Sequence, residues 1–224
     1  MPGDSQCMST SLDWLNGRFI VFDGPDGSGK TTQFDRFVEY CRSNNHDVTL
    51  VREPGGTQIG EQVREILLDP RNTCMSITCE MMLYMSSRAQ LIDQVIGPTL
   101  SAGGTVLADR FISSTLAYQG TGGGIDRKAI LDIGDIVLRN FHPDLTVIFD
   151  VDEETSRSRR SSQPDRIEQR DQVFHERVRQ GYLEQVAEDP DRYLLIDASM
   201  SQDEVFASLE DGIRNRMAAM PARS

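Results

Sequence analysis

The residues best suited to chemistry lie in a glycine-rich segment near the N-terminus, which reads Gly24-Pro25-Asp26-Gly27-Ser28-Gly29-Lys30-Thr31. The segment fits G-x-x-x-x-G-K-[ST] at every fixed position, which is the pattern of a phosphate-binding loop, or P-loop. Glycines let consecutive backbone N–H groups turn toward phosphate oxygens, and a helix that starts after the loop adds its positive N-terminus. Lys30 can reach the outer phosphates, and Thr31 can ligate Mg²⁺. The segment therefore predicts a nucleotide-binding site.

Two arginines follow apolar runs that have the composition of buried strands. Arg52 follows the run 48–51, and Arg110 follows the run 105–108 after one acid, Asp109. In open α/β folds, ligands bind where the strands end, and the planar fork of arginine matches a phosphoryl group. Each arginine alone could form an ordinary surface ion pair. Two of them at strand ends predict a clamp for the phosphate of a second, acceptor nucleotide.

Two places in the sequence could hold Mg²⁺. Asp109 can hold the ion through its waters together with Thr31, because Mg²⁺ takes one or two carboxylates and keeps several waters. A second acidic group, Asp150, Asp152 and Glu153, follows a later apolar run. We interpret this group as the acidic first turn of a helix and expect the metal site at Thr31 and Asp109.

The stretch from Cys79 onward carries a stripe of residues at helical spacing. Its members are Met81, Tyr84, Met85, Arg88, Ile92 and Val95. Arg88 is the charged member, and a buried cation needs either a core carboxylate as its partner or a ligand pocket. Tyr84 lies one turn earlier, so an aromatic face and a guanidinium could together bind a base. Spacing alone leaves core packing and base binding both open.

The polar segment 156–169 and the residue that follows it are rich in arginine. The arginines are Arg157, Arg159, Arg160, Arg166 and Arg170. They could form a solvated charged face. Alternatively, the segment is an exposed, mobile lid that folds over a nucleotide and brings arginine to the transferring phosphoryl group.

The elements that must position these residues alternate along the chain. Short apolar runs predict strands at 19–22, 48–51, 105–108, 145–149 and 193–196. Helical spacing covers 31–43, 58–68, 79–100, 127–139, 171–187 and 202–217. This alternation predicts an α/β fold with a parallel sheet that has helices on both faces. We expect the glycine-rich stretch 120–124 to be a flexible loop.

Composition and net charge limit the classes of protein to which the chain can belong. The chain has 224 residues, 26% of them charged, and a net charge of −12, so we expect one folded domain that binds neither nucleic acid nor membranes. The first residues lack a signal-peptide pattern, and the cysteines form no C-x-x-C pair. We therefore expect a cytoplasmic protein with free thiols.

Together these motifs resemble the thymidylate kinase family of P-loop nucleoside monophosphate kinases. The resemblance covers about residues 18 to 216 and is carried by FDGPDGSGKTTQ, REPGGT, the helix with Tyr84 and Arg88, ADRFISSTLAYQG, DRIE at 165–168 and LLIDA. It implies phosphoryl transfer from Mg-ATP to dTMP, giving ADP and dTDP. It also implies a homodimer formed through helices.

The resemblance implies roles for the acceptor-site residues. Arg52 and Arg110 would bind the dTMP phosphate, and Tyr84 would stack on thymine where the family usually has phenylalanine. Arg88 would contact thymine O4. The remaining residues of this pocket would be Asp26 at the sugar, Tyr118 at its 2′ position, Ser114, Thr115 and Gln119.

For the donor nucleotide, the resemblance implies that ATP binds to the P-loop and the start of its helix. These residues are Gly24, Pro25, Asp26, Gly27, Ser28, Gly29, Lys30, Thr31 and Thr32. The glycine at position 27 indicates the family type that carries its catalytic arginine in the lid. The catalytic residues would be Lys30, Arg110, Arg157, Arg159 and Arg160, with the spacing of the lid arginines leaving open which one meets the γ-phosphate.

These inferences define the domain organisation that we expect. Residues 1–17 would be a flexible N-terminal extension, residues 18–217 a single P-loop kinase domain with a mobile lid at about 153–170, and residues 218–224 a C-terminal tail. A kinase of another nucleoside monophosphate or of a deoxynucleoside, and an ATP-driven switch without an acceptor, are the alternatives.

Overall fold

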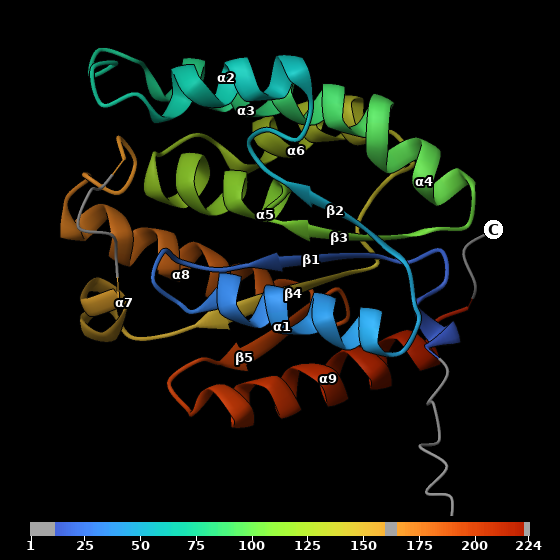
Figure 1. The fold of residues 1–224 in the computed structure, drawn as a ribbon. Coiled ribbons are helices and arrows are strands. Elements are labelled where there is room, and N and C mark those ends of the chain that lie inside the picture. Colours follow the sequence, from blue (N-terminus) through green and yellow to red (C-terminus); the bar gives the residue numbers. More distant parts are fainter. Residues whose placement is uncertain (1–11, 160–164, 222–224) are drawn as a thin grey trace, which may run out of the picture.

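A single parallel sheet organises the computed structural model, which describes residues 12–159 and 165–221 (Figure 1). Its strands in these residues are β1 (Phe19–Asp23), β2 (Val48–Arg52), β3 (Thr105–Asp109), β4 (Leu145–Asp150) and β5 (Tyr193–Asp197). They lie in the order β2-β3-β1-β4-β5, and every neighbouring pair is parallel. The predicted α/β class is therefore confirmed, and all the predicted strands are present.

Helices are present in each of the predicted ranges, and α5 and η3 form in addition between Ile112 and Gly122, where no helix was predicted. They are η1 (Asp13–Leu15), α1 (Lys30–Ser43), α2 (Gln58–Leu68), α3 (Ile77–Leu91), η2 (Ile92–Ile96), α4 (Gly97–Ser101), α5 (Ile112–Thr115), η3 (Leu116–Gly122), α6 (Arg127–Leu138), α7 (Glu153–Arg159), α8 (Gln172–Glu188) and α9 (Gln202–Ala219). The stretch that we predicted as one helix over 79–100 consists of α3, the π-helix η2 and α4.

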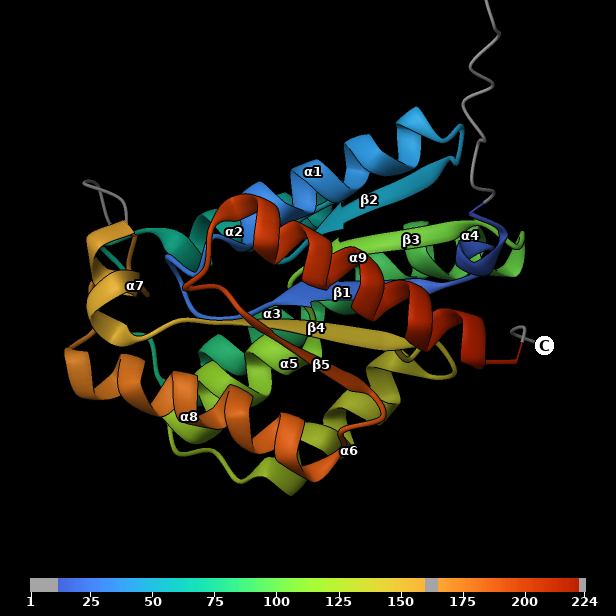
Figure 2. The same ribbon diagram turned by 90° about the horizontal axis from the view of Figure 1, so that it is seen from below.

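The two faces of the sheet are both covered because each strand is apolar on both sides. Ile20 and Phe22 of β1 pack in one core with α1 and α9, whereas Phe19 and Val21 pack in another with α3, α4 and α6. This alternation follows from the two-residue period of a strand. Figures 1 and 2 show α1 and α9 together on one side of the sheet, with α8 and α6 on the other. The part of the chain described contains no helix with the length and apolarity needed to span a membrane.

The register of the sheet brings the residues that follow the strands together. Arg52 at the end of β2 lies opposite Asp109 at the end of β3, and Phe22 of β1 lies opposite the same aspartate. The P-loop follows β1 directly, so the three strand ends form one edge. The two arginine motifs and the glycine-rich loop therefore meet at that edge.

Both ends of the domain differ from our expectation. Leu12 and Leu15, in the segment that we expected to be a flexible extension, are buried in the core beside α1 and α9. Arg18 donates to the carbonyl groups of Met217, Met220 and Pro221, which joins the start of the fold to its C-terminal residues. Periodicity missed these contacts because they join distant parts of the chain.

The glycine-rich stretch 120–124 is not wholly the flexible loop that we expected. Its first part belongs to the π-helix η3, which packs along α8. A Cβ on Gly122 would lie 2.9 Å from the Phe174 ring and 3.0 Å from Val178. The glycine permits this close packing of two helices, so the composition reflects packing and not only loop freedom.

Candidate active site

The P-loop adopts a backbone that only glycine tolerates at two of its positions. Gly24 has a φ of +143° and Gly27 a φ of +77°. A Cβ on Gly24 would lie 2.5 Å from the Phe149 carbonyl oxygen, and one on Gly27 would overlap the Ser156 carbonyl oxygen. These glycines therefore let the loop turn tightly between β1 and α1, so that the N-terminus of α1 faces the space above the loop.

A donor-side cavity lies over the P-loop. Its lining residues are Pro25 to Gln33 of the loop and of α1, Arg110, Arg159, Glu168, Ala198, Met200, Gln202 and Val205. The predicted ATP-binding residues from Pro25 to Thr32 all contribute to it, whereas Gly24 lies beneath. The residues after β5 were not predicted individually, although the LLIDA match ends at this point.

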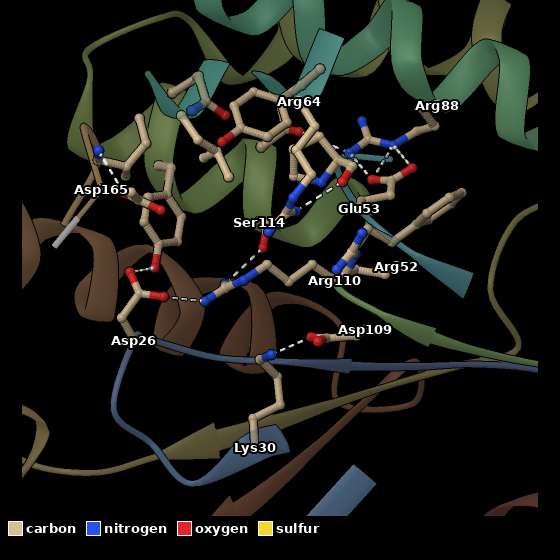
Figure 3. Close-up of a pocket in the computed structure, with 18 of the residues that line it drawn as sticks. Asp26, Lys30, Arg52, Glu53, Arg64, Arg88, Asp109, Arg110, Ser114 and Asp165 are labelled. Carbon is tan, nitrogen blue, oxygen red and sulfur yellow. Dashed lines mark hydrogen bonds and ion pairs between the residues drawn. The ribbon is translucent and has the colours of Figure 1, made fainter. Parts of the chain in front are cut away.

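An acceptor-side cavity lies next to the first one, at the ends of β2 and β3 (Figure 3). It is lined by all nine predicted substrate-binding residues: Asp26, Arg52, Tyr84, Arg88, Arg110, Ser114, Thr115, Tyr118 and Gln119. Sequence reasoning missed seven further residues in its wall: Glu53, Pro54, Arg64, Leu68, Phe111, Asp165 and Ile167. Residues from seven different segments thus converge on one cavity.

The two cavities share a wall. Asp26, Lys30, Thr31 and Arg110 line both of them. Lys30 forms an ion pair with Asp109, which lines the acceptor cavity. Burial and the charge of Arg110 outweigh Asp109 and lower the pKa of Lys30. A group bound in one cavity and a group bound in the other would therefore meet beside a lysine, an arginine and a hydroxyl.

Arg110 has a left-handed backbone, with a φ of +69°. Its Nη2 donates to Asp26 Oδ1 over 2.5 Å, and its Nη1 donates to the Gly24 carbonyl oxygen over 2.9 Å. Tyr118 donates to the other oxygen of Asp26 over 2.8 Å. Burial alone raises the pKa of Asp26, but the Arg110 charge and the Tyr118 hydrogen bond outweigh it and lower that pKa. Asp26 therefore remains an acceptor at neutral pH.

Arg88 has the core carboxylate that one of the two interpretations required, and it also lines the acceptor cavity. It is 1% exposed and forms a two-pronged ion pair with Glu53, with Nε 2.9 Å and Nη2 2.5 Å from Oε2. Its Nη2 also donates to Thr115 over 3.1 Å. Arg88 nevertheless lines the acceptor cavity, so it is anchored by a core carboxylate and presented to the pocket. A buried cation requires such a carboxylate. That requirement predicts an acidic partner for Arg88, but it does not identify Glu53 as that partner.

The predicted lid arginines take different places in the structure. Arg159 lines the donor cavity and donates to the Ala198 carbonyl oxygen over 3.3 Å, whereas Arg157 is exposed and lines neither cavity. Arg160 lies outside the described residues.

The second half of the arginine-rich segment is not the exposed strip that we expected. Arg166 and Arg170 pair with the fully buried Glu80 over 2.7 and 2.9 Å, and Gln119 donates to the same carboxylate over 2.8 Å. Arg166 also donates to the Leu67 carbonyl oxygen. Arg166 and Arg170 therefore attach this segment to α3 and to the end of α2.

The second acidic group has structural partners. Asp150 pairs with Arg179 over 2.7 Å, and Asp152 accepts from the backbone of Thr155 over 2.9 Å at the start of α7. Glu153 lies in the first turn of that helix. This arrangement agrees with our interpretation of the group as the acidic start of a helix.

Comparisons with known proteins agree with this geometry. The family model described as thymidylate kinase matches residues 22–209. The thymidylate kinase of Desulforapulum autotrophicum is 43% identical over 208 residues, covering 89% of this chain and 92% of that protein. That of Deinococcus radiodurans is 44% identical over 202 residues, covering 89% and 98%.

Solved structures point the same way. The crystal structure of thymidylate kinase from Ehrlichia chaffeensis superposes with a TM-score of 0.70 at 34% identity, covering 87% of this chain and 97% of that one. Fold, sequence and the two adjoining cavities lead to one conclusion: the chain belongs to the thymidylate kinase family, whose members use ATP to phosphorylate dTMP to dTDP.

Proposed function

We propose that the chain carries out this reaction with ATP in the donor cavity and dTMP in the acceptor cavity. The observation that carries the proposal is the wall that the cavities share, formed by Asp26, Lys30, Thr31 and Arg110. An oxygen of the dTMP phosphate attacks the γ-phosphorus of ATP, a new P–O bond forms, and the bond to the β-phosphate oxygen breaks to release ADP. Such a step depends on positioning and charge stabilisation more than on a base.

The P-loop and Lys30 hold the ATP phosphates in this proposal. Backbone N–H groups of the loop point at the phosphate oxygens, and Lys30 neutralises charge on the outer ones. In the structure, Lys30 is paired with the Asp109 carboxylate. Once phosphate is bound, Lys30 can exchange Asp109 for a phosphoryl oxygen.

Thr31 and Asp109 are the groups that would hold Mg²⁺. Thr31 lines both cavities, and Asp109 has one oxygen on Lys30 and a second oxygen without a hydrogen-bond partner among the described residues. A hydroxyl and a free carboxylate oxygen beside phosphates suit this ion. The ion would supply positive charge to the phosphoryl oxygens.

Six side chains orient dTMP in the acceptor cavity. Arg52 and Arg110 bind its phosphate, and Asp26 binds the sugar. Tyr84 stacks on the base, and Arg88, held rigidly by Glu53, donates to the base carbonyl. Tyr118, hydrogen-bonded to Asp26, fills the space next to the 2′ position of the sugar.

Arg159 is the lid arginine that we assign to the transferring phosphoryl group. It lines the donor cavity, whereas Arg157 lines neither cavity. We expect Arg159→Ala to lower kcat by about 10³-fold or more, the magnitude typical of an arginine at a transferring phosphoryl group, and Arg157→Ala to leave kcat within about twofold. If instead Arg157→Ala lowers kcat and Arg159→Ala does not, Arg157 contacts the transferring phosphoryl group. If neither variant lowers kcat, no arginine of α7 has this role.

A coupled assay of ADP formation from Mg-ATP tests the function as a whole. We expect turnover that depends on dTMP, exceeds that with dUMP, dCMP, dGMP and thymidine, and is lost in Lys30→Ala. Equal turnover of all the monophosphates would refute the proposed roles of Tyr84, Arg88 and Tyr118. ATP hydrolysis that ignores every added nucleotide would refute the acceptor site itself.

We also propose that the chain forms a homodimer through its helices. Large apolar side chains are exposed on α2, α3 and α6, and Ile136 on α6 is 77% exposed. The others on these helices are Ile59, Ile66, Met82 and Leu131. Sedimentation should give a dimer for the wild type and a monomer for Ile136→Glu. A wild-type monomer at micromolar concentration would refute the proposal.

A further inference from the structure

Tyr182 places a hydroxyl directly behind the acceptor-site arginine. It lies on α8, is 1% exposed, and lines neither cavity. Its hydroxyl is 2.6 Å from Asp23 Oδ1 and 3.2 Å from Arg110 Nη1. Asp23 is itself fully buried at the end of β1, just before the P-loop. A buried tyrosine therefore joins a buried carboxylate to an arginine that faces the substrate cavity.

The directions of these hydrogen bonds follow from the donors available. A hydroxyl has one proton to donate, and a guanidinium can only donate. Tyr182 and Ser114 both donate to Asp23 Oδ1, over 2.6 and 2.7 Å. The two hydroxyls lie 3.0 Å from each other and 3.2 and 3.1 Å from Arg110 Nη1, whose two N–H groups are shared between them and the Gly24 carbonyl oxygen. The two hydroxyls thus stand between Asp23 and Arg110 and hold both of them.

Direct contact between the carboxylate and the guanidinium is weaker than these relayed contacts. Arg110 Nη1 lies 3.3 Å from Asp23 Oδ1, which is longer than its distance to either hydroxyl. Such charge-assisted bonds are strongest near 2.7–2.9 Å. Together with the Gly24 carbonyl oxygen, 2.9 Å away, the hydroxyls therefore hold Nη1 in place.

The conformation of Arg110 makes this support necessary. Its φ of +69° is one that a residue with a Cβ rarely adopts, and such backbone strain persists only where the surroundings enforce it. Nη1 is directed at Gly24, Asp23 and the two hydroxyls, and Nη2 is directed at Asp26. In the described residues Nε has no hydrogen-bond partner, so Nε, with the second N–H of Nη2, is available to a ligand.

We propose that Tyr182 is a positioning residue for the phosphate clamp. Its hydroxyl holds the Nη1 side of Arg110 against Asp23 and so turns the opposite edge toward the phosphate of the acceptor nucleotide. This inference rests on the role of Arg110 under the proposed function. It extends the acceptor site to a residue on α8 that no substrate touches.

Binding of dTMP and of thymidine to the full chain, measured by titration calorimetry, tests the proposal. Thymidine lacks the phosphate, so it reports on the base and sugar contacts alone. We expect Tyr182→Phe to weaken dTMP binding by about five- to tenfold, which corresponds to the net contribution of one hydrogen bond. Thymidine binding and the KM for ATP should change by less than twofold.

The matched control is Tyr193→Phe. Its hydroxyl donates to Gln185 Oε1 over 3.1 Å, away from both cavities. It should leave both affinities unchanged. If Tyr182→Phe weakens thymidine as much as dTMP, or weakens neither, the positioning role is refuted.

A further variant separates this inference from the proposed function. Arg110→Gln should weaken dTMP more than Tyr182→Phe does and should spare thymidine. If Arg110→Gln weakens dTMP binding selectively while Tyr182→Phe weakens neither ligand selectively, Arg110 binds the phosphate but Tyr182 does not position it. If Arg110→Gln has no selective effect, both fail. Should Tyr182→Phe not fold, Ser114→Ala removes the other hydroxyl, and an unchanged ratio of the two affinities there would refute the relay.

Discussion

The ion pair between Arg88 and Glu53 allows a prediction in which the two partners are not equivalent. Both side chains are at most 3% exposed, and they meet over 2.5 Å. Arginine cannot lose its proton in a protein, whereas a carboxylate can become neutral. Burial raises the pKa of Glu53 even with the Arg88 charge beside it. Removing the carboxylate should therefore cost more than removing the arginine.

The magnitude follows from the burial of the pair. Glu53→Leu leaves a charged guanidinium without its carboxylate, and breaking a buried pair in this way costs about 3 to 5 kcal/mol. For a domain of this size the loss lowers Tm by about 6 to 20 °C. Arg88→Met should cost less, because Glu53 can take up a proton. The double variant should regain most of the wild-type stability, since neither charge remains.

The pH dependence of Arg88→Met follows from the same reasoning. Without Arg88, burial raises the folded-state pKa of Glu53 above its unfolded value near 4.3. A raised folded pKa contributes stability that is complete below the unfolded pKa and is lost as the pH rises through the folded pKa. The difference in unfolding free energy between the variant and the wild type should therefore be smallest near pH 5 and grow toward pH 8.

Urea unfolding followed by circular dichroism at both pH values measures all three variants. Lys128→Met is the control, because it removes an exposed pair with Asp132 that should contribute less than about 0.5 kcal/mol. The reasoning is refuted if Glu53→Leu unfolds within about 1 kcal/mol of the wild type. It is also refuted if Arg88→Met costs as much as Glu53→Leu at both pH values.

Two further predictions concern other buried groups. Arg170→Met removes one of the two arginines that pair with the buried carboxylate of Glu80. We expect limited proteolysis to cut the segment 165–170 faster in this variant than in the wild type, while the rest of the domain resists cleavage. If the segment resists cleavage as well as it does in the wild type, the ion pair does not attach it. Burial raises the pKa of the Cys41 thiol to about 12, so at pH 8 iodoacetamide should modify the exposed Cys74 and Cys79 and spare Cys41 until the protein unfolds. Peptide mapping that finds Cys41 modified in the folded protein would contradict this. Because the folded pKa of Cys41 lies above its unfolded value, the stability that this thiol contributes should be lost progressively between about pH 9 and pH 12.

The local pattern of the sequence determined most of the fold. Wholly apolar runs of four or five residues mark strands buried on both faces, and helical spacing marks the segments between them. The P-loop could be recognised directly because its glycines, Lys30 and Thr31 lie in one contiguous segment and need no distant partner to define the motif. Arg52 and Arg110 could be placed near each other because parallel strands all end at one edge of the sheet.

Only the tertiary structure decided how these residues are supported. Glu53 reaches Arg88 across 35 residues and Tyr182 reaches Asp23 across 159, and no spacing rule connects such positions. The arginine-rich segment divides between Arg159 over the donor cavity and Arg166 on Glu80, although its composition is uniform. The physical reason is that a buried charge is stable only beside a partner, and the packing of distant elements determines which partner that is.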